Sequence, residues 1–564
     1  MLAAWVSPFL GNTTWRPRKQ LASTKSSKPL HSHAVSLQNG ERQDRSDAPQ
    51  TSPPSAPTPL LDALVRESRN VRANFFCPGH KQGAAVFPRL REELGDAAFP
   101  LDMPELPALD NLFAPEGVLE ESQELAADTF TEEGADAWNT FFLVNGSTCG
   151  VEAAILSTVR PNRKIVLPRN THQSAVHALV LTGAIPVWIQ PLYDAEHDLL
   201  HGVSTESIER ALDQNKGQVD AVLLISPTYH GACSDVAAIA AITHKHGAML
   251  LVDEAHGSHF AFHDLLPSSA TECNADIVVQ STHKTLSALS QAAMMHVRKS
   301  SLSRQRVAAS LQLVQSTSPN NLLLVSLEAA RALMDEQGED LMSRSIDIAR
   351  NCAVRIASLK GFSVLGVENV GMLQKDALGH PYVYALDPTR ITVLLPDNIT
   401  GYDMDTVLID RFGVYAELPS FKHITFVITP GNVQGDINRL VTALALYEAT
   451  SGEGLPYLEP EESEPSAGCS SFAEPTGLTP RDAFFSDAEV VDSDEAVGRI
   501  SAESLCPYPP GIPVVVPGER ITRECIDVLR AVLDAGGSVS GASDESLSTM
   551  RVVANEDKLN LDMS

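Results

Sequence analysis

The stretch Asp276-Ile-Val-Val-Gln-Ser-Thr-His-Lys-Thr-Leu-Ser-Ala-Leu-Ser-Gln291 decides the fold of this chain. An apolar run typical of a buried strand ends there in a loop of small and polar residues that carries Lys284. Parallel α/β sheets bind their ligands at the carboxyl ends of the strands. A lysine amine held at that edge can form a Schiff base with a carbonyl cofactor, whereas an ordinary loop lysine is simply solvated. The surrounding sequence decides between these two interpretations.

Apolar segments alternate regularly with helical segments before and after this loop. The predicted strands cover residues 141–144, 164–168, 185–189, 221–225, 248–253, 277–279 and 291–297. The predicted helices between them cover residues 150–159, 171–181, 205–212 and 236–246. This alternation predicts an α/β fold with a mostly parallel, doubly wound sheet. Asn145, Asp253 and Lys284 then lie at strand ends, along the edge where such sheets bind ligands.

The predicted sheet belongs to a large domain over residues 60–300, which includes an N-terminal segment. Residues 301–450 predict a linking helical region, broken near residues 315–319, and a smaller α+β domain. The strands of this smaller domain are expected at residues 383–386, 391–395 and 424–428. Two folded domains therefore account for most of the chain before residue 450.

The remainder of the chain changes character twice. Residues 451–505 are rich in acidic residues, Ser and Pro, a composition that predicts a disordered insertion. Residues 506–564 are expected to form a C-terminal segment that starts with a Pro-rich motif, Pro507-Tyr-Pro-Pro-Gly-Ile-Pro513. A short amphipathic helix is predicted at residues 520–533, and the tail after Gly537 is expected to be disordered.

The N-terminal end is basic in a chain that is otherwise strongly acidic. Its first 40 residues contain several Arg and Lys residues and many Ser and Thr residues, but no Asp or Glu. This composition is typical of an organellar transit peptide, although a disordered tail has a similar composition. We expect residues 1–59 to be a transit peptide followed by a flexible linker. The expected location is the chloroplast stroma, with the mitochondrial matrix or the cytoplasm as alternatives.

Charge and cysteine content exclude several function classes. The formal net charge of -29 argues against nucleic acid or an anionic membrane as a partner and suits a cationic substrate. The eight cysteines form no close pairs and show no metal-ligand spacing, so we expect neither disulfides nor a metal site. Runs of about 18 apolar residues, the length that a membrane span needs, do not occur in the sequence.

Groups at the predicted sheet edge match the needs of a pyridoxal 5′-phosphate enzyme. Lys284 would hold the cofactor aldehyde, and Asp253 would keep the pyridine nitrogen protonated, which makes the ring an electron sink. Ser147 and Thr148, at a predicted helix N-terminus, would bind the phosphate. The remaining contacts would come from His283 to the phosphate and from His172 stacked on the ring.

Each of these groups has an ordinary structural alternative. Ser147 and Thr148 can be a plain helix cap, Asp253 can cap a helix, and His172 can be a buried or loop histidine. Their order along the chain favours the cofactor site. A phosphate loop, a stacking histidine, a strand-end acid and then a lysine is the order that a fold-type-I pyridoxal phosphate enzyme requires.

The chain resembles the Orn/Lys/Arg decarboxylase major-domain family, the prokaryotic-type basic amino acid decarboxylases. The resemblance covers about residues 60–450 and the Pro-rich C-terminal motif. It rests on these stretches: Phe76-Cys-Pro-Gly-His-Lys-Gln-Gly83, Asp110-Asn-Leu-Phe-Ala-Pro-Glu-Gly117, Asn145-Gly-Ser-Thr148, Asp253-Glu-Ala-His-Gly257, Ser281-Thr-His-Lys284, Ser316-Thr-Ser-Pro319 and Pro507-Tyr-Pro-Pro-Gly-Ile-Pro513.

The resemblance implies a fold-type-I homodimer, possibly a tetramer, with active sites at the subunit interface. It implies that Ser318 or Thr317 reaches the partner's cofactor phosphate, and that Ala255 lies under the ring. Glu417 matches the family's acidic position near the substrate, where a carboxylate can pair with a distal ammonium or guanidinium group. Three further residues are assigned by the same resemblance: Ser281 and His256 to the cofactor, and His80 to the substrate.

The activity implied is α-decarboxylation of arginine, lysine or ornithine to agmatine, cadaverine or putrescine. Another fold-type-I reaction, transamination or desulfuration, is an alternative because these enzymes share the cofactor contacts. A regulatory homologue without activity is a second alternative. The Pro-Gly-His motif at Pro78 comes too early to leave room for the N-terminal wing domain that builds decamers in large bacterial members.

Overall fold

The computed structural model describes residues 56–366, 382–396, 399–449, 471–508, 510–554 and 556. These described residues all belong to one compact unit. Residues 1–55 of the predicted transit peptide and linker lie outside the described residues, and so do residues 451–470, the first part of the acidic stretch. Within the described ranges, no helix combines the length and apolar character needed to cross a membrane.

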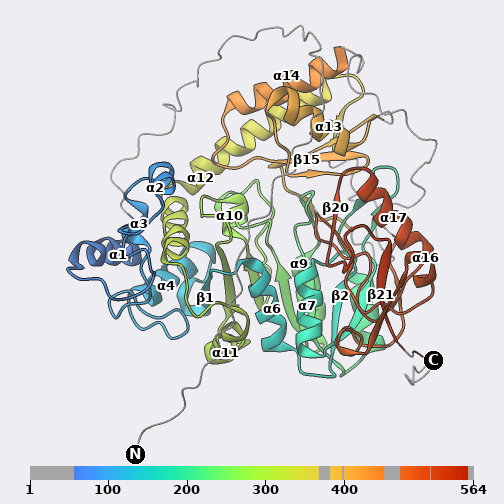
Figure 1. The fold of residues 1–564 in the computed structure, drawn as a ribbon, viewed down its shortest axis with the longest axis horizontal. Helices are drawn as coiled ribbons and strands as arrows, with labels where there is room; N and C mark the ends of the chain where they lie inside the picture. The colour runs from blue at the N-terminus through green and yellow to red at the C-terminus, as the bar shows by residue number, and fades with distance from the viewer. Residues whose placement is uncertain are drawn as a thin grey trace, which may run out of the picture. The chain divides into compact units, whose positions relative to one another are not determined.

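A large sheet lies at the centre of this unit (Figure 1). It has seven strands in the order β1-β10-β9-β8-β6-β2-β3. Strand β10 runs antiparallel to both of its neighbours, and the other neighbouring strands pair in parallel. The predicted, mostly parallel sheet is therefore confirmed. Its strands are β1 (Trp138–Leu143), β2 (Lys164–Pro168), β3 (Ile185–Ile189), β6 (Val219–Ile225), β8 (Met249–Asp253), β9 (Ile277–Gln280) and β10 (Ala293–Arg298).

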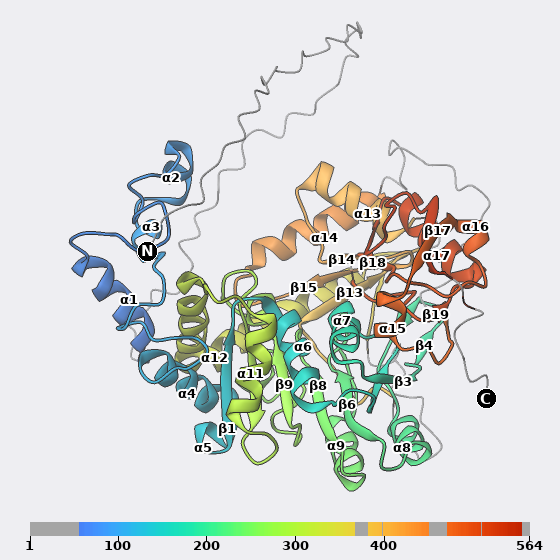
Figure 2. The same ribbon diagram turned by 60° about the horizontal axis from the view of Figure 1, so that its bottom comes forward.

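Helices cover both faces of the sheet, because alternate residues of each strand point to opposite sides (Figure 2). In β2, Ile165 and Leu167 pack with α6 and α7, whereas Val166 packs with α8 and α9. This two-sided burial explains why the strands are continuous apolar runs. The covering helices are α6 (Gly146–Thr158), α7 (Gln173–Thr182), α8 (Thr205–Gln214), α9 (Val236–Lys245) and α11 (Arg304–Val314).

Close packing fixes α6 against the sheet. A Cβ atom added to Gly150 would lie 2.7 Å from both Leu143 Cδ1 and Val279 Cγ1, so only glycine lets the helix approach β1 and β9 this closely. The contact places the N-terminus of α6 beside the loop that follows β9. There, the Ser281 hydroxyl donates a hydrogen bond of 2.8 Å to Ser147 Oγ.

The N-terminal segment packs on the long helix α12 (Asn321–Ala357). Glu328 of α12 accepts hydrogen bonds from the backbone N–H groups of Leu60 and Leu61, which have no partner inside their own helix. A shared apolar core joins α1, α4 and α12. The helices of this segment are α1 (Pro59–Asn70), α2 (Pro88–Leu94), α3 (Ala98–Leu101), α4 (Val118–Phe130) and α5 (Gly134–Ala137).

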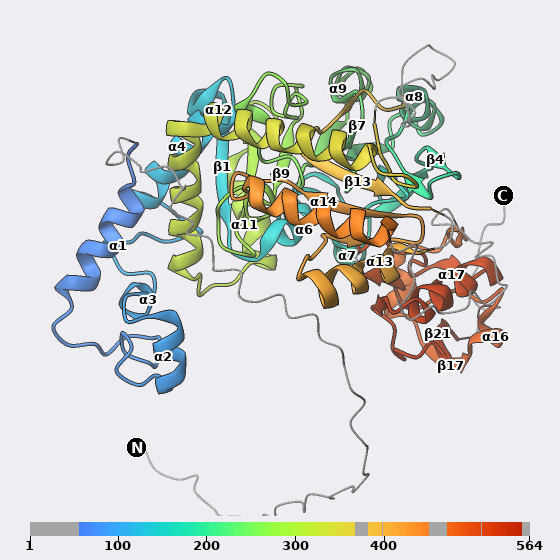
Figure 3. The same ribbon diagram turned by 90° about the horizontal axis from the view of Figure 1, so that it is seen from above.

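The smaller domain is an antiparallel sheet, β11-β13-β15-β14, covered by helices. Figure 3 shows α12 and α14 side by side over this region. The break near residues 315–319 is confirmed, since Asn320 caps α12 by accepting from Leu322 N. The strand predicted at residues 383–386 is instead a short link, β12 (Ala385–Leu386), to β7 (Ala232–Cys233) of the large domain. The other elements are β11 (Ser363–Val364), β13 (Arg390–Leu394), α13 (Gly401–Val407), β14 (Leu418–Pro419), β15 (His423–Val427) and α14 (Gln434–Ala449).

The C-terminal region corrects two predictions. Residues 471–505, assigned from the sequence to a disordered insertion over residues 451–505, are folded, and so is the tail after Gly537 up to residue 554. Strand β17 pairs along its length with β21, and Ala483, Ile500 and Val553 share a buried cluster. These contacts join segments far apart in sequence, so local composition could not reveal them. The elements are β16 (Glu474–Pro475), α15 (Pro480–Phe485), β17 (Ala488–Asp492), α16 (Ser493–Ala496), β18 (Cys506–Tyr508), β19 (Glu519–Arg520), α17 (Arg523–Asp534), β20 (Ser538–Ser540) and β21 (Thr549–Val553).

Candidate active site

A cavity lies at the carboxyl edge of the large sheet, and all three folded parts of the chain contribute to its wall. Six of the predicted site residues line it together: Ser147, His172, Asp253, Ala255, His256 and Lys284. The small domain adds Tyr402, Phe421 and His423, and the C-terminal region adds Phe472, Pro507, Pro510, Ile512 and Val514. The predicted edge of the sheet is therefore one wall of a cavity that the small domain and the C-terminal region complete.

Lys284 enters this cavity from α10 (Thr282–Thr285), a single turn that follows β9. Its Nζ lies 3.0 Å from His256 Nε2 and 5.4 Å from the ring centroid of Tyr229. Burial lowers the pKa of Lys284, the carboxylate of Asp253 opposes this shift, and the positive charge of Arg390 adds to it. An amine whose pKa is lowered is unprotonated more often at neutral pH, which is the form that attacks a carbonyl.

Asp253 ends β8 on the neighbouring strand, and its side chain is nearly buried, with 8% exposure. Its Oδ1 accepts a hydrogen bond of 3.1 Å from the backbone N–H of Ala255. Burial raises the pKa of Asp253, while the charge of Lys284 pulls it back. A buried carboxyl of this kind is stabilised by a cationic N–H group placed opposite it.

Two of the residues predicted near the phosphate, Ser147 and Ser281, form a pair of hydrogen-bonded hydroxyl groups, and their binding of phosphate stays a prediction. Ser147 lies in the first turn of α6 and faces the cavity, and Ser281 is bound to it. Thr148 is exposed, and neither it nor His283 belongs to the cavity wall. Burial lowers the pKa of His283, and the nearby charge of Lys284 lowers it further.

His172 is the N-cap of α7, where its Nδ1 accepts from the backbone N–H of Ser174. Burial, helped by the charge of Lys284, lowers its pKa to about 4, so the ring is neutral at physiological pH. The Pro-rich motif packs against this ring: a Cβ on Gly511 would lie 3.0 Å from His172 Cδ2 and Nε2. Gln173 N also donates to Gly511 O at 3.0 Å.

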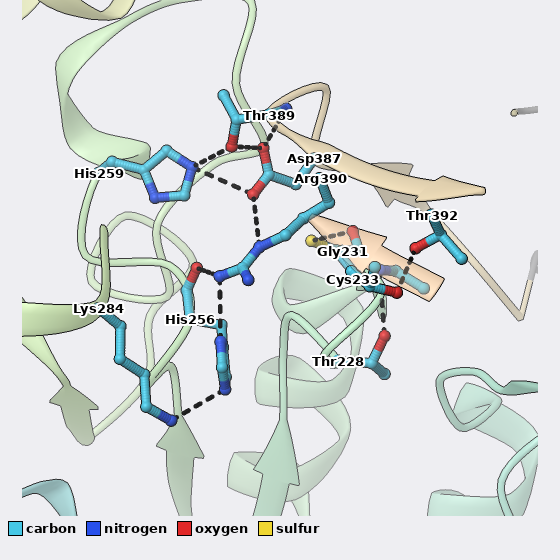
Figure 4. A network of polar contacts seen from close by, with 12 residues as sticks. Thr228, Gly231, Cys233, His256, His259, Lys284, Asp387, Thr389, Arg390 and Thr392 are labelled. Atoms are coloured by element: carbon cyan, nitrogen blue, oxygen red, sulfur yellow. Dashed lines mark hydrogen bonds and ion pairs between the residues drawn. The ribbon is translucent and has the colours of Figure 1, made fainter. Parts of the chain in front are cut away.

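Sequence reasoning missed Tyr229 and Arg390. The ring of Tyr229 lies 4.2 Å from that of His256, centroid to centroid. Arg390 Nη2 lies 3.0 Å from His256 Nδ1 (Figure 4). Tyr229 could have been found, because it follows β6 at the same edge as Asp253. Arg390 begins a strand of the small domain and reaches the site only through the packing of two domains, which no local pattern signals.

Several predicted residues lie outside the cavity wall of this single chain. Glu417 is exposed, although its negative charge acts on Lys284 and opposes the lowering of the lysine pKa. Thr317 and Ser318 are exposed. His80 Nε2 lies 3.0 Å from Asp102 Oδ2, within the N-terminal segment. Roles for Thr317, Ser318 and His80 at this site stay predictions.

No group of three or more His, Cys, Asp or Glu side chains in the part of the chain that the structure describes is arranged to hold a metal ion.

Comparison with known proteins assigns most of the folded region to one family. Residues 58–434 match the Orn/Lys/Arg decarboxylase major domain, and residues 473–546 match the C-terminal domain of the same family. An arginine decarboxylase of Bacillus subtilis is 35% identical over 88% of this chain and 98% of its own length. One from Halalkalibacterium halodurans is 35% identical over 89% of this chain and 99% of its own length.

A lysine decarboxylase of Francisella novicida has a similar solved structure, with a TM-score of 0.75 at 22% identity. The match covers 88% of this chain and 81% of that one. The match confirms the predicted fold-type-I architecture, and the C-terminal match explains why residues 471–505 are folded. By its sequence over residues 58–434 and by its relatives, the chain belongs to the Orn/Lys/Arg decarboxylase family.

Proposed function

We propose that this chain is a pyridoxal 5′-phosphate enzyme that decarboxylates L-arginine to agmatine and CO2. Family membership supports decarboxylation of a basic amino acid. Relatives named arginine decarboxylase are 35% identical to the chain, whereas a lysine decarboxylase of Pseudomonas aeruginosa is 25% identical. The observation that carries the proposal is the cavity that Lys284 and Asp253 share, with the lysine pKa lowered.

The residues around the cavity fit pyridoxal phosphate by their chemistry. Lys284 supplies a partly buried amine for the aldehyde, and Asp253 supplies a buried carboxyl for a cationic ring nitrogen. Ser147, at the N-terminus of a long helix, supplies a hydroxyl and unpaired backbone N–H groups for the phosphate. His172 and Ala255 supply a flat neutral ring and a small side chain. We propose that these five residues hold the cofactor.

The chain's own groups then have separate tasks in the reaction. When bound, the cofactor takes up the electron pair that remains at Cα as the carboxylate leaves as CO2. Asp253 holds a proton on the ring nitrogen, which keeps the ring electron-poor. Apolar side chains such as Phe421, Ile512 and Val514 keep water from the reacting atoms. A proton added at Cα in place of the carboxylate completes the amine.

The cavity wall also offers a place for the distal cation. Asp198 lines the cavity, is 5% exposed, and its Oδ1 accepts a hydrogen bond of 2.8 Å from the Tyr193 hydroxyl. Glu417 adds negative charge from the small domain, as its effect on the pKa of Lys284 shows. A carboxyl in a desolvated wall suits the guanidinium of arginine, which can be bound through two N–H groups at once.

Release of labelled CO2 from carboxyl-labelled arginine, lysine and ornithine tests this proposal. We expect the purified protein with pyridoxal phosphate to release CO2 fastest from arginine, and the Lys284→Ala variant to release none. Formation of a keto acid without CO2 would favour the aminotransferase alternative. A colourless protein that binds no cofactor and turns over none of the three amino acids would favour the regulatory alternative.

We also propose a homodimer with shared active sites. The exposed segment with Thr317 and Ser318 is tied to the phosphate site, because Ser316 N donates to Asn145 Oδ1 at 3.1 Å. Exposed hydroxyl groups at this place can serve the site of a second copy. Mixing Lys284→Ala with a Ser318→Ala/Thr317→Ala double variant should restore activity in mixed dimers if the sites are shared. No recovery, with both variants dimeric by light scattering, would contradict it.

A plastid location is the proposal for the cell. The acid-free composition of the first 40 residues supports it. Residues 1–59 fused to a fluorescent protein should direct it into chloroplasts. Fluorescence in mitochondria or in the cytoplasm would replace this proposal with one of its alternatives.

A further inference from the structure

A chain of polar contacts runs from the small domain to the lysine amine. Asp387 Oδ2 lies 3.7 Å from Arg390 Nε, Arg390 Nη2 lies 3.0 Å from His256 Nδ1, and His256 Nε2 lies 3.0 Å from Lys284 Nζ (Figure 4). All three groups behind the lysine are buried, with exposures of 0% for Asp387, 4% for Arg390 and 5% for His256. The proposed cofactor contacts leave this arrangement unexplained.

The hydrogen-bond donors and acceptors of Arg390, His256 and Lys284 allow only one placement of the protons. A guanidinium has only donors, so His256 Nδ1 accepts from Arg390 and carries no proton. A neutral imidazole has one N–H group, so the proton of His256 is on Nε2, which faces Lys284. An ammonium group also has only donors. The contact at 3.0 Å is therefore a hydrogen bond from His256 to the lone pair of a neutral Lys284 amine.

The other protonation states do not match these donors and acceptors. A charged Lys284 that donated to His256 Nε2 would leave both ring nitrogens as acceptors, which is an imidazolate. A doubly protonated His256 would point an N–H group at the guanidinium of Arg390. Burial lowers the pKa of His256, and the charges of Lys284 and Arg390 lower it further, which opposes that state as well.

Arg390 is held so that this assignment is fixed. Its Nη2 also donates to the backbone carbonyl of His256 at 3.2 Å, so two contacts from one nitrogen orient the ring relative to its own backbone. Asp387 accepts hydrogen bonds from Thr389 N and Thr389 Oγ1 and lies 3.1 Å from His259 Nε2. The carboxylate that faces Arg390 is therefore itself fixed in place.

We propose that Arg390 is a positioning residue that, with Asp387 behind it, fixes His256 as the Nε2-protonated tautomer and thereby keeps the free Lys284 amine neutral. This deepens the proposed function, because a neutral amine is the form that captures the cofactor carbonyl each time the amine is set free. With His256 protonated on Nε2, a protonated Lys284 cannot accept the hydrogen bond from His256, so protonation of the amine loses that bond. A positive charge that acted directly on Lys284 could also lower the lysine pKa, but that effect would not depend on the imidazole of His256.

Other charged and titratable groups also act on Lys284 and must be separated from this effect. Asp253 and Glu417 favour the charged amine, whereas burial and Arg390 disfavour it. The groups that lie near Lys284 from the surrounding elements are Asp253 on β8, His172 at the N-cap of α7, Tyr229 after β6, His256 after β8, His283 on α10, Arg390 on β13 and Glu417 before β14. Only the contribution of Arg390 is expected to depend on His256.

Competitive labelling of the full-length, cofactor-free protein with acetic anhydride measures this directly. Labelling of Lys284 is followed by mass spectrometry against pH, with exposed Lys216 as the internal reference for reagent. The midpoint is the pH at which half of the Lys284 amine is neutral. The measurement needs neither cofactor nor turnover, so its result stands whether or not arginine is the substrate. The set is wild type, Arg390→Met, His256→Phe and the double variant, with Arg390→Lys as the conservative change.

We expect Arg390→Met to raise the Lys284 midpoint by about one pH unit or more. In the His256→Phe background, the same change should shift the midpoint by much less, because the ring that transmits it is gone. Arg390→Lys keeps a donor and a charge at this place and should stay near wild type. Arg344→Met, which removes an arginine bound to Pro430 O outside the cavity, is the matched control and should not shift the midpoint.

Two results would overturn the proposal. An equal shift from Arg390→Met with and without His256 would show that Arg390 acts by its charge alone. An unchanged midpoint in Arg390→Met would show no role for it. Should Arg390→Met fail to fold, Arg390→Lys combined with Asp387→Asn removes the fixed carboxylate but keeps a cation. If Asp387 and Arg390 fix the tautomer of His256, the labelling midpoint of Lys284 should rise in this double variant. A midpoint at the wild-type value contradicts the proposal.

Discussion

Arg169→Met tests how the C-terminal domain is held at the active site. Arg169 follows β2, is 1% exposed, and donates to Pro513 O at 2.6 Å and Val514 O at 3.0 Å. Its Nη2 also lies 2.8 Å from Glu519 Oε2, in a buried ion pair. The guanidinium lies 4.4 Å from the ring centroid of Phe472. One side chain thus joins the large domain to the loop that lines the cavity with Val514.

The expected effect follows from leaving Glu519 without its partner. Removing one member of a buried ion pair costs about 3–5 kcal/mol, mainly because the remaining charge stays desolvated. About 1.4 kcal/mol corresponds to a factor of ten, so local opening of the C-terminal domain should become about a hundredfold to a few thousandfold more frequent. Arg169→Met combined with Glu519→Met leaves no buried charge and should restore most of this loss.

Hydrogen exchange followed by mass spectrometry over residues 471–554 measures this opening. Arg169→Met should speed exchange in these residues. The KM for the substrate should rise as well, because Gly511 no longer packs against the ring of His172. Arg163→Met is the matched control, since Arg163 pairs with Asp220 and its side chain is 30% exposed. Unchanged exchange in Arg169→Met, or a double variant that opens as often as the single one, would refute this reasoning.

Three further outcomes are expected. Lys284→Ala should lose both the visible absorbance of the bound cofactor and CO2 release, and turnover without Lys284 would contradict its role. Asp253→Asn should keep the bond from Ala255 N and the fold but lower kcat by about a hundredfold or more, measured at saturating cofactor. His201, His296 and His423 have pKa values near 4, 3 and 3 against 6.5 in the unfolded chain, because burial penalises their charge. Since the unfolded state takes up protons first, the melting temperature should fall as pH drops from about 6.5 towards 4, and less so in His296→Phe.

Sequence patterns predicted the large domain well because its strands are buried on both faces. Apolar runs that end in Asp253 or lead to Lys284 reveal both the strand and the edge where it stops. Helix positions followed from the same alternation, as in α9, which was predicted at residues 236–246 and spans Val236–Lys245. Ser147 and His172 were found because they follow strands at this edge.

Contacts between domains could not be predicted from local patterns. Arg390, Asp387 and His256 meet because a small-domain strand packs over the large sheet, and Gly511 reaches His172 from more than 300 residues along the chain. Residues 471–505, the first part of the folded C-terminal region, were assigned to a disordered insertion because acidic residues, Ser and Pro dominate the composition of residues 451–505. Their small buried core is assembled with residues near β21, outside any local window.

Borohydride reduction followed by peptide mapping tests the central claim most directly. Reduction fixes the bond between a lysine and pyridoxal phosphate, so mass spectrometry can identify the lysine in the active enzyme. We predict a phosphopyridoxyl group on Lys284, with loss of CO2 release from arginine in proportion to its formation. Modification of another lysine, or arginine decarboxylation that persists after complete reduction without label on Lys284, would contradict the account.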